Sequence, residues 1–493
     1  MSLPIFSFIY IGILIIIFLY SSNLRTFYIN NVTLLFFLEI IASQGYFIQF
    51  SSQEYYIDVI QLYIVFLLSL ILLACNLNGR RHLIYAVFIF LGISLSSVLY
   101  QAIFPYDGYI LPAELNGMDC SWDTYVAGKS VLYKYNFDLF QNVSFYKRLC
   151  MYTVVIYTMK INISFANTYR VLTNLIRCSF FIVLYGYFEM ILKNLLNMPM
   201  EVYKFSEFFF GASVSTYTWE SAATMVDGSY RLQGFTREPS HYVFSLLIIS
   251  LLILISMKYH KVANIVTPCW YYVELLLILI LMPMTGGMSS IWCIFSLILS
   301  YIIISLNKSF NYYKMLKFGF CVLLGFGILF LMFKFLLDNS DFLLIERFSR
   351  SLETLSFLLS NPNVLQIIGM DGSTLARFTS IIVCAGNWLD NPFLGLGYGI
   401  TRAHDFTITM LVGNGLLGCS AWYHLITTSG NVKKRYDHLL LLFIFCIMLI
   451  PIGSLGGWYT STYFMLLAEA TALYRNNGVV GSYSSKNWSG YDV

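Results

Sequence analysis

Long apolar runs separated by short polar segments dominate the hydropathy pattern of the chain. They cover residues 4–20, 32–50, 58–75, 83–104, 149–166, 171–192, 241–257, 263–284, 287–306, 318–337, 405–427, 439–452 and 458–474. A helix needs about 20 apolar residues to cross a bilayer. The pattern therefore predicts an all-α, polytopic integral membrane protein with about 13 transmembrane helices (between about 12 and 14).

Three long segments interrupt the predicted helices, at residues 105–148, 193–240 and 338–404. Loops of this length are too long to be simple connections, and long loops often carry function. Within them, residues 342–359 and 198–210 have apolar side chains at helical spacing, which predicts short amphipathic helices at the membrane surface. We expect residues 1–475 to form a single membrane domain, followed by a polar tail at 476–493.

Basic residues gather in the short loops on one side of the predicted helices. They are Arg80, Arg81, Lys258, Lys261, Lys308, Lys314, Lys317, Lys433, Lys434 and Arg435. Short cytoplasmic loops carry an excess of Lys and Arg, so this side should be cytoplasmic. The sequence therefore predicts a multi-pass membrane protein. Its tail would lie in the cytoplasm, and its N-terminus and long loops would face the periplasm or the cell exterior.

The composition narrows the class of protein further. Hydrophobic residues make up 58% of the chain and charged residues only 11%, against about 25% charged residues in soluble domains. This excludes a soluble enzyme, a disordered regulator and a nucleic-acid-binding protein. The ten cysteines form no C-x-x-C pair and no Cys/His cluster, and neither D-x-D nor H-E-x-x-H occurs. We expect no metal site and no cofactor.

The first candidate site runs from Arg231 into the apolar run that begins after His241. Pro239 suits the first position of a helix, and the free N–H groups of a helix N-terminus attract anions. Arg231 and Arg237 could bind phosphate oxygens in bidentate fashion, with Gly234 allowing the tight turn between them. The alternative is that both arginines extend to lipid headgroups and Glu238 pairs with one of them.

A second candidate site contains Gly395, Gly397 and Gly399 within a turn-rich stretch. Glycines at this spacing could cradle a phosphate, but there is no lysine and no Rossmann strand beside them. Close backbone approach in a packed loop is the simpler interpretation.

Charged residues flank these glycines. Arg377 precedes them, and Arg402 and His404 follow just before the next apolar run, where Asp405 could cap the helix. A helix N-terminus disfavours a cationic imidazole and would keep His404 able to accept a proton near neutral pH. A purely structural histidine is the alternative.

Several of these motifs together resemble a known family. Their order along the chain is Arg231-x-x-Gly234-Phe-x-x-Glu238-Pro239-Ser240, the turn Thr285–Ser290, Asn391-Pro-Phe-Leu-Gly-Leu-Gly-Tyr-Gly399, His404, and Gly415-Leu-Leu-Gly418. The pattern is similar to the O-antigen polymerase and O-antigen ligase superfamily of bacterial inner-membrane glycosyltransferases. The resemblance implies a GT-C-like, metal-independent and nucleotide-independent transferase that acts on undecaprenyl-diphosphate-linked glycans. It also implies a multi-pass protein of the bacterial inner (plasma) membrane whose active site faces the periplasm.

The same resemblance assigns roles to the candidate residues. Arg231 and Arg377 match the family's loop arginines and would bind the diphosphate, supported by Arg237 and Arg402. His404 matches the histidine that ligases carry and would be the catalytic base, with Glu238 as second choice. Asp405 stands where ligases have Asn, and Glu-Pro-Ser replaces their Asn-Pro-Asn. These differences favour a polymerase over a ligase.

The expected function is therefore polymerisation of lipid-linked O-antigen or capsule repeat units at the outer face of the membrane. Undecaprenyl-diphosphate-linked oligosaccharides would be donor and acceptor, and membrane lipids and a chain-length-regulating membrane protein would be partners. Two alternatives stay open. An O-antigen ligase would transfer the glycan to lipid A-core. A lipid-glycan flippase or other transporter should place charged residues near the middle of its spans, whereas most charges here lie in the outer loops.

Overall fold

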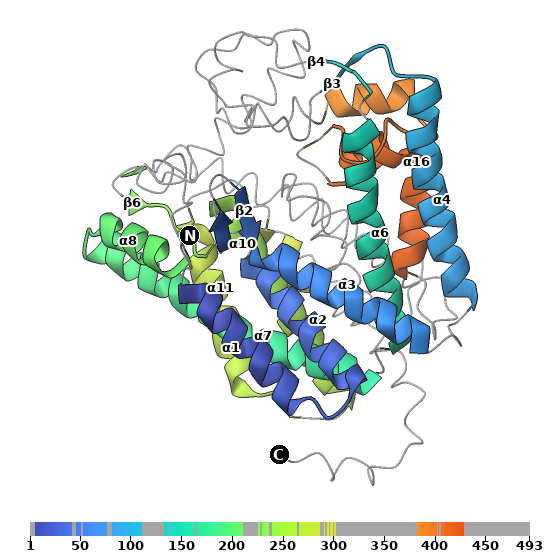
Figure 1. Cartoon of the computed structure of the whole chain (residues 1–493). Coiled ribbons are helices and arrows are strands. Elements are labelled where there is room, and N and C mark those ends of the chain that lie inside the picture. The colour runs from blue at the N-terminus through green and yellow to red at the C-terminus, as the bar shows by residue number, and fades with distance from the viewer. Residues whose placement is uncertain are drawn as a thin grey trace, which may run out of the picture.

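The computed structural model describes residues 5–41, 46–50, 53–75, 81–110, 133–137, 139–162, 165–210, 225–226, 229–235, 239–263, 266–285, 290, 293–294, 296–298, 300–301, 381, 383–401, 403 and 406–427. These residues are mostly helical, which confirms the predicted all-α class (Figure 1). The helices are α1 (Ile5–Tyr20), α2 (Leu24–Ile41), α3 (Ile57–Cys75), α4 (Arg81–Ile103), α6 (Leu139–Asn162), α7 (Phe165–Met190), α8 (Pro199–Phe210), α10 (Pro239–Ala263), α11 (Cys269–Met284) and α16 (Phe406–Thr427).

One predicted span is wrong in its second half. The apolar run at 32–50 was expected to be a single helix, but α2 ends at Ile41 and residues 46–50 form strand β1 (Tyr46–Phe50). This strand pairs antiparallel with β2 (Gln53–Tyr56). Aromatic and β-branched residues such as Tyr46 and Ile48 are as apolar as helix residues but prefer strands. At its other end α2 begins earlier than predicted, where the side chain of Asn23 accepts a hydrogen bond from the backbone N–H of Thr26 (2.8 Å).

The first long loop is shorter than the predicted 105–148. Helix α6 begins at Leu139, so the last ten predicted loop residues are helical. Polar residues such as Gln141 and Lys147 lower the hydropathy of this first part of the helix, so it does not belong to an apolar run. Before it, β3 (Tyr109–Ile110) pairs with β4 (Tyr133–Lys134).

Helix α7 ends in a π-helical turn, η1 (Ile191–Leu195). Beyond it Asn197 has a left-handed backbone (φ 53°), a conformation that ends many helices and that Asn tolerates. The next helix, α8, begins at Pro199 and covers the segment where an amphipathic helix was predicted.

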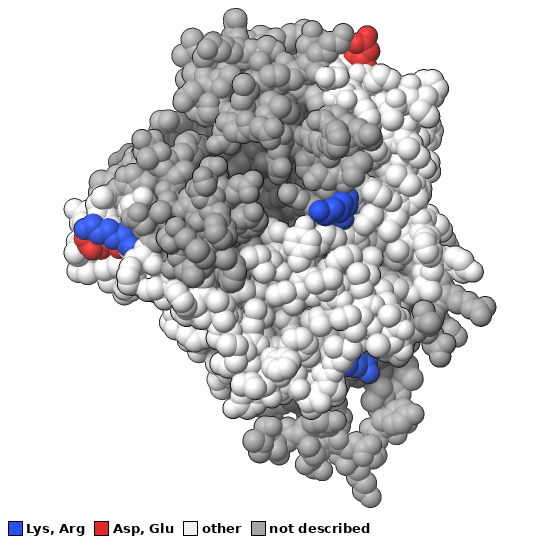
Figure 2. Space-filling view, in the orientation of Figure 1, with Lys and Arg blue, Asp and Glu red and all other residues white. Residues whose placement is uncertain are grey.

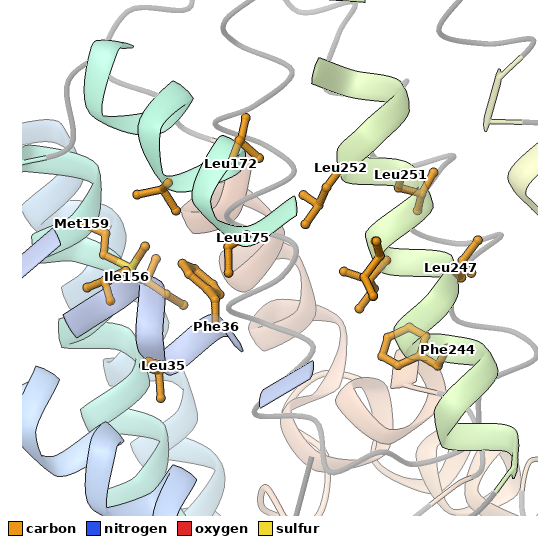
Figure 3. Close-up of a cluster of buried hydrophobic side chains, with 14 of the residues drawn as sticks. Leu35, Phe36, Ile156, Met159, Leu172, Leu175, Phe244, Leu247, Leu251 and Leu252 are labelled. Carbon is orange, nitrogen blue, oxygen red and sulfur yellow. The ribbon is translucent and has the colours of Figure 1, made fainter. Parts of the chain in front are cut away.

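The core lies between α2, α6, α7 and α10. In Figure 3, Phe36 of α2, Ile156 of α6 and Leu175 of α7 point toward one another, and Leu247 and Leu251 project from α10. Every α10 residue from Tyr242 to Ile255 is buried, as expected of a helix that is apolar on all sides. Helix α4 packs along α16 and α6, on the other side of the array (Figure 1).

Two helical stretches of the described residues are long and apolar enough to cross a membrane. They are Ile84–Ile103 in α4 and Arg170–Leu195 in α7 and η1. The last turns of both stretches contact a segment that carries predicted site residues. Gln101 of α4 contacts Gly395, and Glu189 of α7 contacts Gly234.

Candidate functional site

The segment that carries Arg231 is bound to the end of α7. The buried carboxylate of Glu189 accepts hydrogen bonds from the backbone N–H of Gln233 (3.1 and 3.3 Å to its two oxygens) and from that of Gly234 (2.7 Å). Backbone N–H groups bound to an ionised acceptor form stronger hydrogen bonds than neutral pairs do. One acidic side chain thus fixes the backbone two and three residues after Arg231.

A lysine completes this anchor from the π-helical turn. Nζ of Lys193 lies 2.6 Å from Oε1 of Glu189, and the two side chains are only 2% and 0% exposed. The same Nζ donates to the backbone carbonyl oxygen of Arg231 (3.3 Å). The Glu189–Lys193 pair therefore contacts residues 231, 233 and 234 together.

The neighbouring residue, Asn194, binds the strand that precedes Arg231. Its Nδ2 donates to the carbonyl oxygen of Tyr230 (3.1 Å), and its Oδ1 accepts from the Tyr230 N–H (2.7 Å). Tyr230 belongs to β6 (Ser229–Tyr230), which pairs with β5 (Met225–Val226). The asparagine amide thus satisfies the backbone of Tyr230 as another strand would.

The Arg231 side chain is half-buried and reaches the end of α11. Its Nε donates to the carbonyl oxygen of Thr285 (3.2 Å), and the Thr285 hydroxyl donates back to Met282 within α11 (2.9 Å). This hydrogen bond orients the guanidinium plane. It also brings together two motifs that lie 54 residues apart in the sequence, the Arg231 segment and the turn beginning at Thr285.

Gly234 allows the chain to pass closely over the first turns of α10. Its φ is 57°, and a Cβ atom there would lie 2.3 Å from the ring of the fully buried Tyr242. The next residue, Phe235, stacks on Tyr185 of α7 with ring centroids 3.9 Å apart. Pro239 is the first residue of α10, where the sequence predicted a helix start.

The glycine-rich loop, residues 391–399, forms backbone hydrogen bonds with α16. Helix α16 is interrupted at Gly415 (φ 65°, ψ −173°). Two N–H groups from the loop, those of Leu396 and Gly397, donate to the carbonyls of Val412 and Gly413 (2.7 and 2.9 Å). Beyond the break, the N–H groups of Leu416 and Leu417 donate to Pro392 and Phe393 (2.8 and 3.2 Å). Backbone groups released by the helix break are therefore satisfied by the loop.

Glycine is required where these two backbones meet. Gly395, Gly397 and Gly399 have φ values of 71°, 99° and 85°, which side chains rarely tolerate. A Cβ atom on Gly395 would lie 2.6 Å from the Val412 carbonyl oxygen, and one on Gly415 would lie 2.1 Å from that of Phe393. These glycines serve close backbone packing between the loop and α16.

The last turn of α4 also contacts the glycine-rich loop. The Gln101 amide donates to the Gly395 carbonyl (3.0 Å) and accepts from the Tyr106 N–H (3.1 Å). The Tyr106 hydroxyl in turn donates to Asp390 (2.8 Å), at the end of the helical residues 383–390. Burial, the hydrogen bond to Asp390 and its negative charge raise the pKa of Tyr106 to about 12. The phenol therefore stays protonated and can donate at neutral pH.

Cys384 offers a direct test of this packing. Its buried thiol lies 3.4 Å from the Thr401 hydroxyl, and burial raises its pKa to about 11, although that hydrogen bond lowers it. Only the thiolate reacts readily with alkylating agents, and it forms only as pH approaches this raised value. We predict that N-ethylmaleimide modifies exposed Cys75 but leaves Cys384 unmodified between about pH 7 and pH 9, as measured by mass spectrometry of the folded protein. Equal modification of both cysteines would contradict the packing.

Among the described residues, the hydrogen bonds of the two candidate sites lead to different helices. Arg231, Gly234 and Pro239 lie with α7, α10 and α11, whereas Gly395, Gly397 and Gly399 lie with α4 and α16. The other predicted residues fall outside the described part of the chain. They are Arg237, Glu238, Arg377, Arg402, His404 and Asp405.

Four residues that position these loops were not predicted as site residues: Glu189, Lys193, Asn194 and Gln101. A signal for the first two was present, because Glu189 lies inside the apolar run at 171–192, with Lys193 just after its end. A charged residue in such a run is costly unless it is paired or functional. Nothing in the sequence indicated which loop they bind. Among the residues described, no three His, Cys, Asp or Glu side chains lie together as a metal site would require.

No known protein family matches the chain, and no curated protein or solved structure matches it either.

Proposed function

We propose that the chain is a polytopic membrane protein with about 13 transmembrane helices. The two long apolar stretches in α4 and α7 support this, as do shorter apolar helices such as α1, α3 and α11. Large apolar side chains are exposed along these helices, for example Phe88 and Ile89 of α4 and Phe18 of α1. Figure 2 shows few charged side chains on the described surface in this view. Such a surface suits lipid better than water.

The basic loops give the proposed orientation. With Arg80, Arg81, Lys258 and Lys261 on the cytoplasmic side, α4 and α7 end at the periplasmic face. Both candidate loops are bound to these ends. The proposed active site therefore faces the periplasm of a bacterial inner membrane.

The proposed reaction joins repeat units of an O-antigen or capsule glycan. The growing glycan on undecaprenyl diphosphate is the donor, and a single undecaprenyl-diphosphate-linked repeat unit is the acceptor. An acceptor hydroxyl oxygen forms a bond to the anomeric carbon of the donor while the bond from that carbon to the diphosphate oxygen breaks. The hydroxyl proton passes to a base, and undecaprenyl diphosphate leaves as an anion.

The single observation that carries the proposal is the way Arg231 is held. Its carbonyl, its guanidinium and the two backbone N–H groups that follow at positions 233 and 234 are each bound by a neighbouring helix end. A positioned guanidinium can bind the two phosphates as negative charge develops on the leaving group. Arg377 is its proposed partner, with Arg237 and Arg402 in support.

The proposed base is His404, with Glu238 as the alternative. A histidine near a helix N-terminus is held neutral and can accept the acceptor's proton near pH 7. The resemblance to the polymerase and ligase superfamily supports this assignment. The differences in its motifs favour polymerase over ligase.

Deletion of the gene tests the proposal directly. If the protein is a polymerase, the cell's lipopolysaccharide should lose its ladder on a gel and show core carrying one repeat unit. Bare core would instead indicate a ligase. If unprocessed lipid-linked repeat units accumulate on the cytoplasmic side, a flippase is indicated.

Catalysis should not depend on a divalent ion, because arginines supply the positive charge in this proposal. We predict that purified protein keeps its polymerase rate, within about twofold, in excess EDTA, since no bound metal ion would act as Lewis acid. The measurement is glycan length after incubation with lipid-linked repeat units. A rate that falls in EDTA and returns with Mg²⁺ or Mn²⁺ would contradict the prediction.

A further inference from the structure

We infer that Glu189 and Lys193 are positioning residues for Arg231, and that they set the orientation of its guanidinium toward the diphosphate of the lipid-linked glycan. The inference rests on the proposed function. Neither residue needs to touch substrate. Their effect passes through the backbone of residues 231–234 and the hydrogen bond from Arg231 to Thr285.

The contacts of the pair are concentrated on this one segment. Every hydrogen bond described above for the Glu189 carboxylate goes either to Lys193 or to the N–H groups of Gln233 and Gly234. Lys193 adds the carbonyl of Arg231. With donors and acceptors contacted on both sides of Leu232, which is itself fully buried, the segment has little freedom to rotate.

Stability alone is a weak reason for such a pair. Removing two charges from water is costly, and well-packed apolar residues often stabilise a fold as well as a buried ion pair does. What the ion pair adds is direction, because a charged carboxylate accepts two backbone N–H groups at defined angles. A precise arginine orientation is a use that apolar residues could not serve.

The π-helical turn places the anchoring residues. The N–H of Leu196 donates to the carbonyl of Ile191, five residues earlier (2.9 Å). Within this widened turn the consecutive residues Lys193 and Asn194 both reach the same segment, at Arg231 and Tyr230. Single π turns inside helices occur frequently at functional sites.

A second pair provides a matched control. Glu201 and Lys204 of α8 also form an ion pair (2.8 Å), but their side chains are 46% and 62% exposed. Exposed pairs contribute little to stability. Glu201→Gln is the same substitution and removes the same negative charge, but it does not disturb the Arg231 segment.

The test uses full-length protein in nanodiscs with undecaprenyl-diphosphate-linked repeat units. Glu189→Gln should lower kcat about 30-fold while KM changes less than about threefold, because a small misplacement of a catalytic group can cost this much. Hydrogen exchange at the Gln233 and Gly234 amides should accelerate in the same variant. Glu201→Gln should match the wild type in both measurements.

A second background separates positioning from general damage. In an Arg231→Lys protein, Glu189→Gln should change kcat less than about threefold, since the point charge of lysine has no plane to orient. If Glu189→Gln does not accumulate in the membrane, Glu189→Met/Lys193→Met replaces the whole pair without leaving an unpaired charge. The same losses are expected from that double variant.

Two results would overturn the inference. One is an active wild type with Glu189→Gln, or the double methionine variant in its place, equal to Glu201→Gln in kcat and exchange. The other is a loss of kcat that is as large in the Arg231→Lys background as in the wild type. A wild type that makes no polymer instead contradicts the proposed function, and exchange at the two amides still reports whether Glu189 anchors the segment.

Discussion

Replacing Arg231 with alanine is expected to lower polymer formation at least about 100-fold while the protein remains in the membrane, as expected when a donor that stabilises the developing charge is lost. In the proposed reaction the leaving diphosphate is an anion, and Arg231, whose Nε donates to the Thr285 carbonyl, is the residue proposed to bind it. Arg377→Ala should have an effect of the same size. The measurement is the ladder of glycan lengths in cells that express each variant from a plasmid.

Two further variants distinguish the role of Arg231 from its charge alone. Arg231→Lys should restore less than about a tenth of the wild-type rate, because an ammonium cannot form the bidentate contact. Arg25→Ala removes an exposed arginine at the start of α2 and should leave the ladder unchanged. A full ladder from Arg231→Ala would remove this residue from the mechanism.

Hydropathy predicted some of the described helices closely and others only in part, because it registers apolar residues and not the more polar turns near helix ends. The predicted runs 58–75, 83–104 and 405–427 differ by at most two residues at either end from α3, α4 and α16. The predicted helix bounds are wrong where apolar residues do not form a helix or where polar residues do. Residues 46–50, three of which are aromatic, form a strand, and the polar first turns of α6 form a helix.

The candidate sites were predicted in part. The sequence indicated Arg231, Gly234 and the glycine loop, since unusual residues beside a helix start are visible locally. It did not indicate that Glu189 binds Gly234, because that contact joins residues 45 positions apart. The interruption of α16 was also missed, since Gly415 lies in an apolar run that is consistent with an unbroken helix.

The two candidate sites are held in the same way. Each loop that carries predicted residues is held through its backbone by a polar side chain near the end of a long apolar helix, Glu189 in α7 and Gln101 in α4. This anchoring uses the backbone of each loop, and in the proposed function the loop's own side chains contact substrate. Loop positions are then set by the helices, which suits a site that must hold charged groups in fixed geometry.

Gly415→Ala is expected to destabilise the protein by at least about 2 kcal/mol, because φ 65° with ψ −173° is a backbone region for glycine. The new Cβ atom would also lie 2.1 Å from the backbone oxygen of Phe393. The position of this Cβ atom is fixed by the backbone of residue 415, and the atoms that it would meet are backbone atoms of Phe393 and Leu394. No side chain can therefore move aside to make room for it. The thermal midpoint in detergent should fall, and the loop at 391–399 should become accessible to protease.

Gly92→Ala is the matched control, and its effect should have the opposite sign. Gly92 lies inside α4, and a Cβ atom there would meet no atom within 4 Å. Alanine favours a helix interior over glycine by about 0.5–1 kcal/mol, so this variant should be as stable as the wild type or slightly more stable. If Gly415→Ala melts at the same temperature as Gly92→Ala, the loop does not pack into the break in α16. The backbone hydrogen bonds between Leu396 and Val412 and between Leu416 and Pro392 would then not hold the second site together.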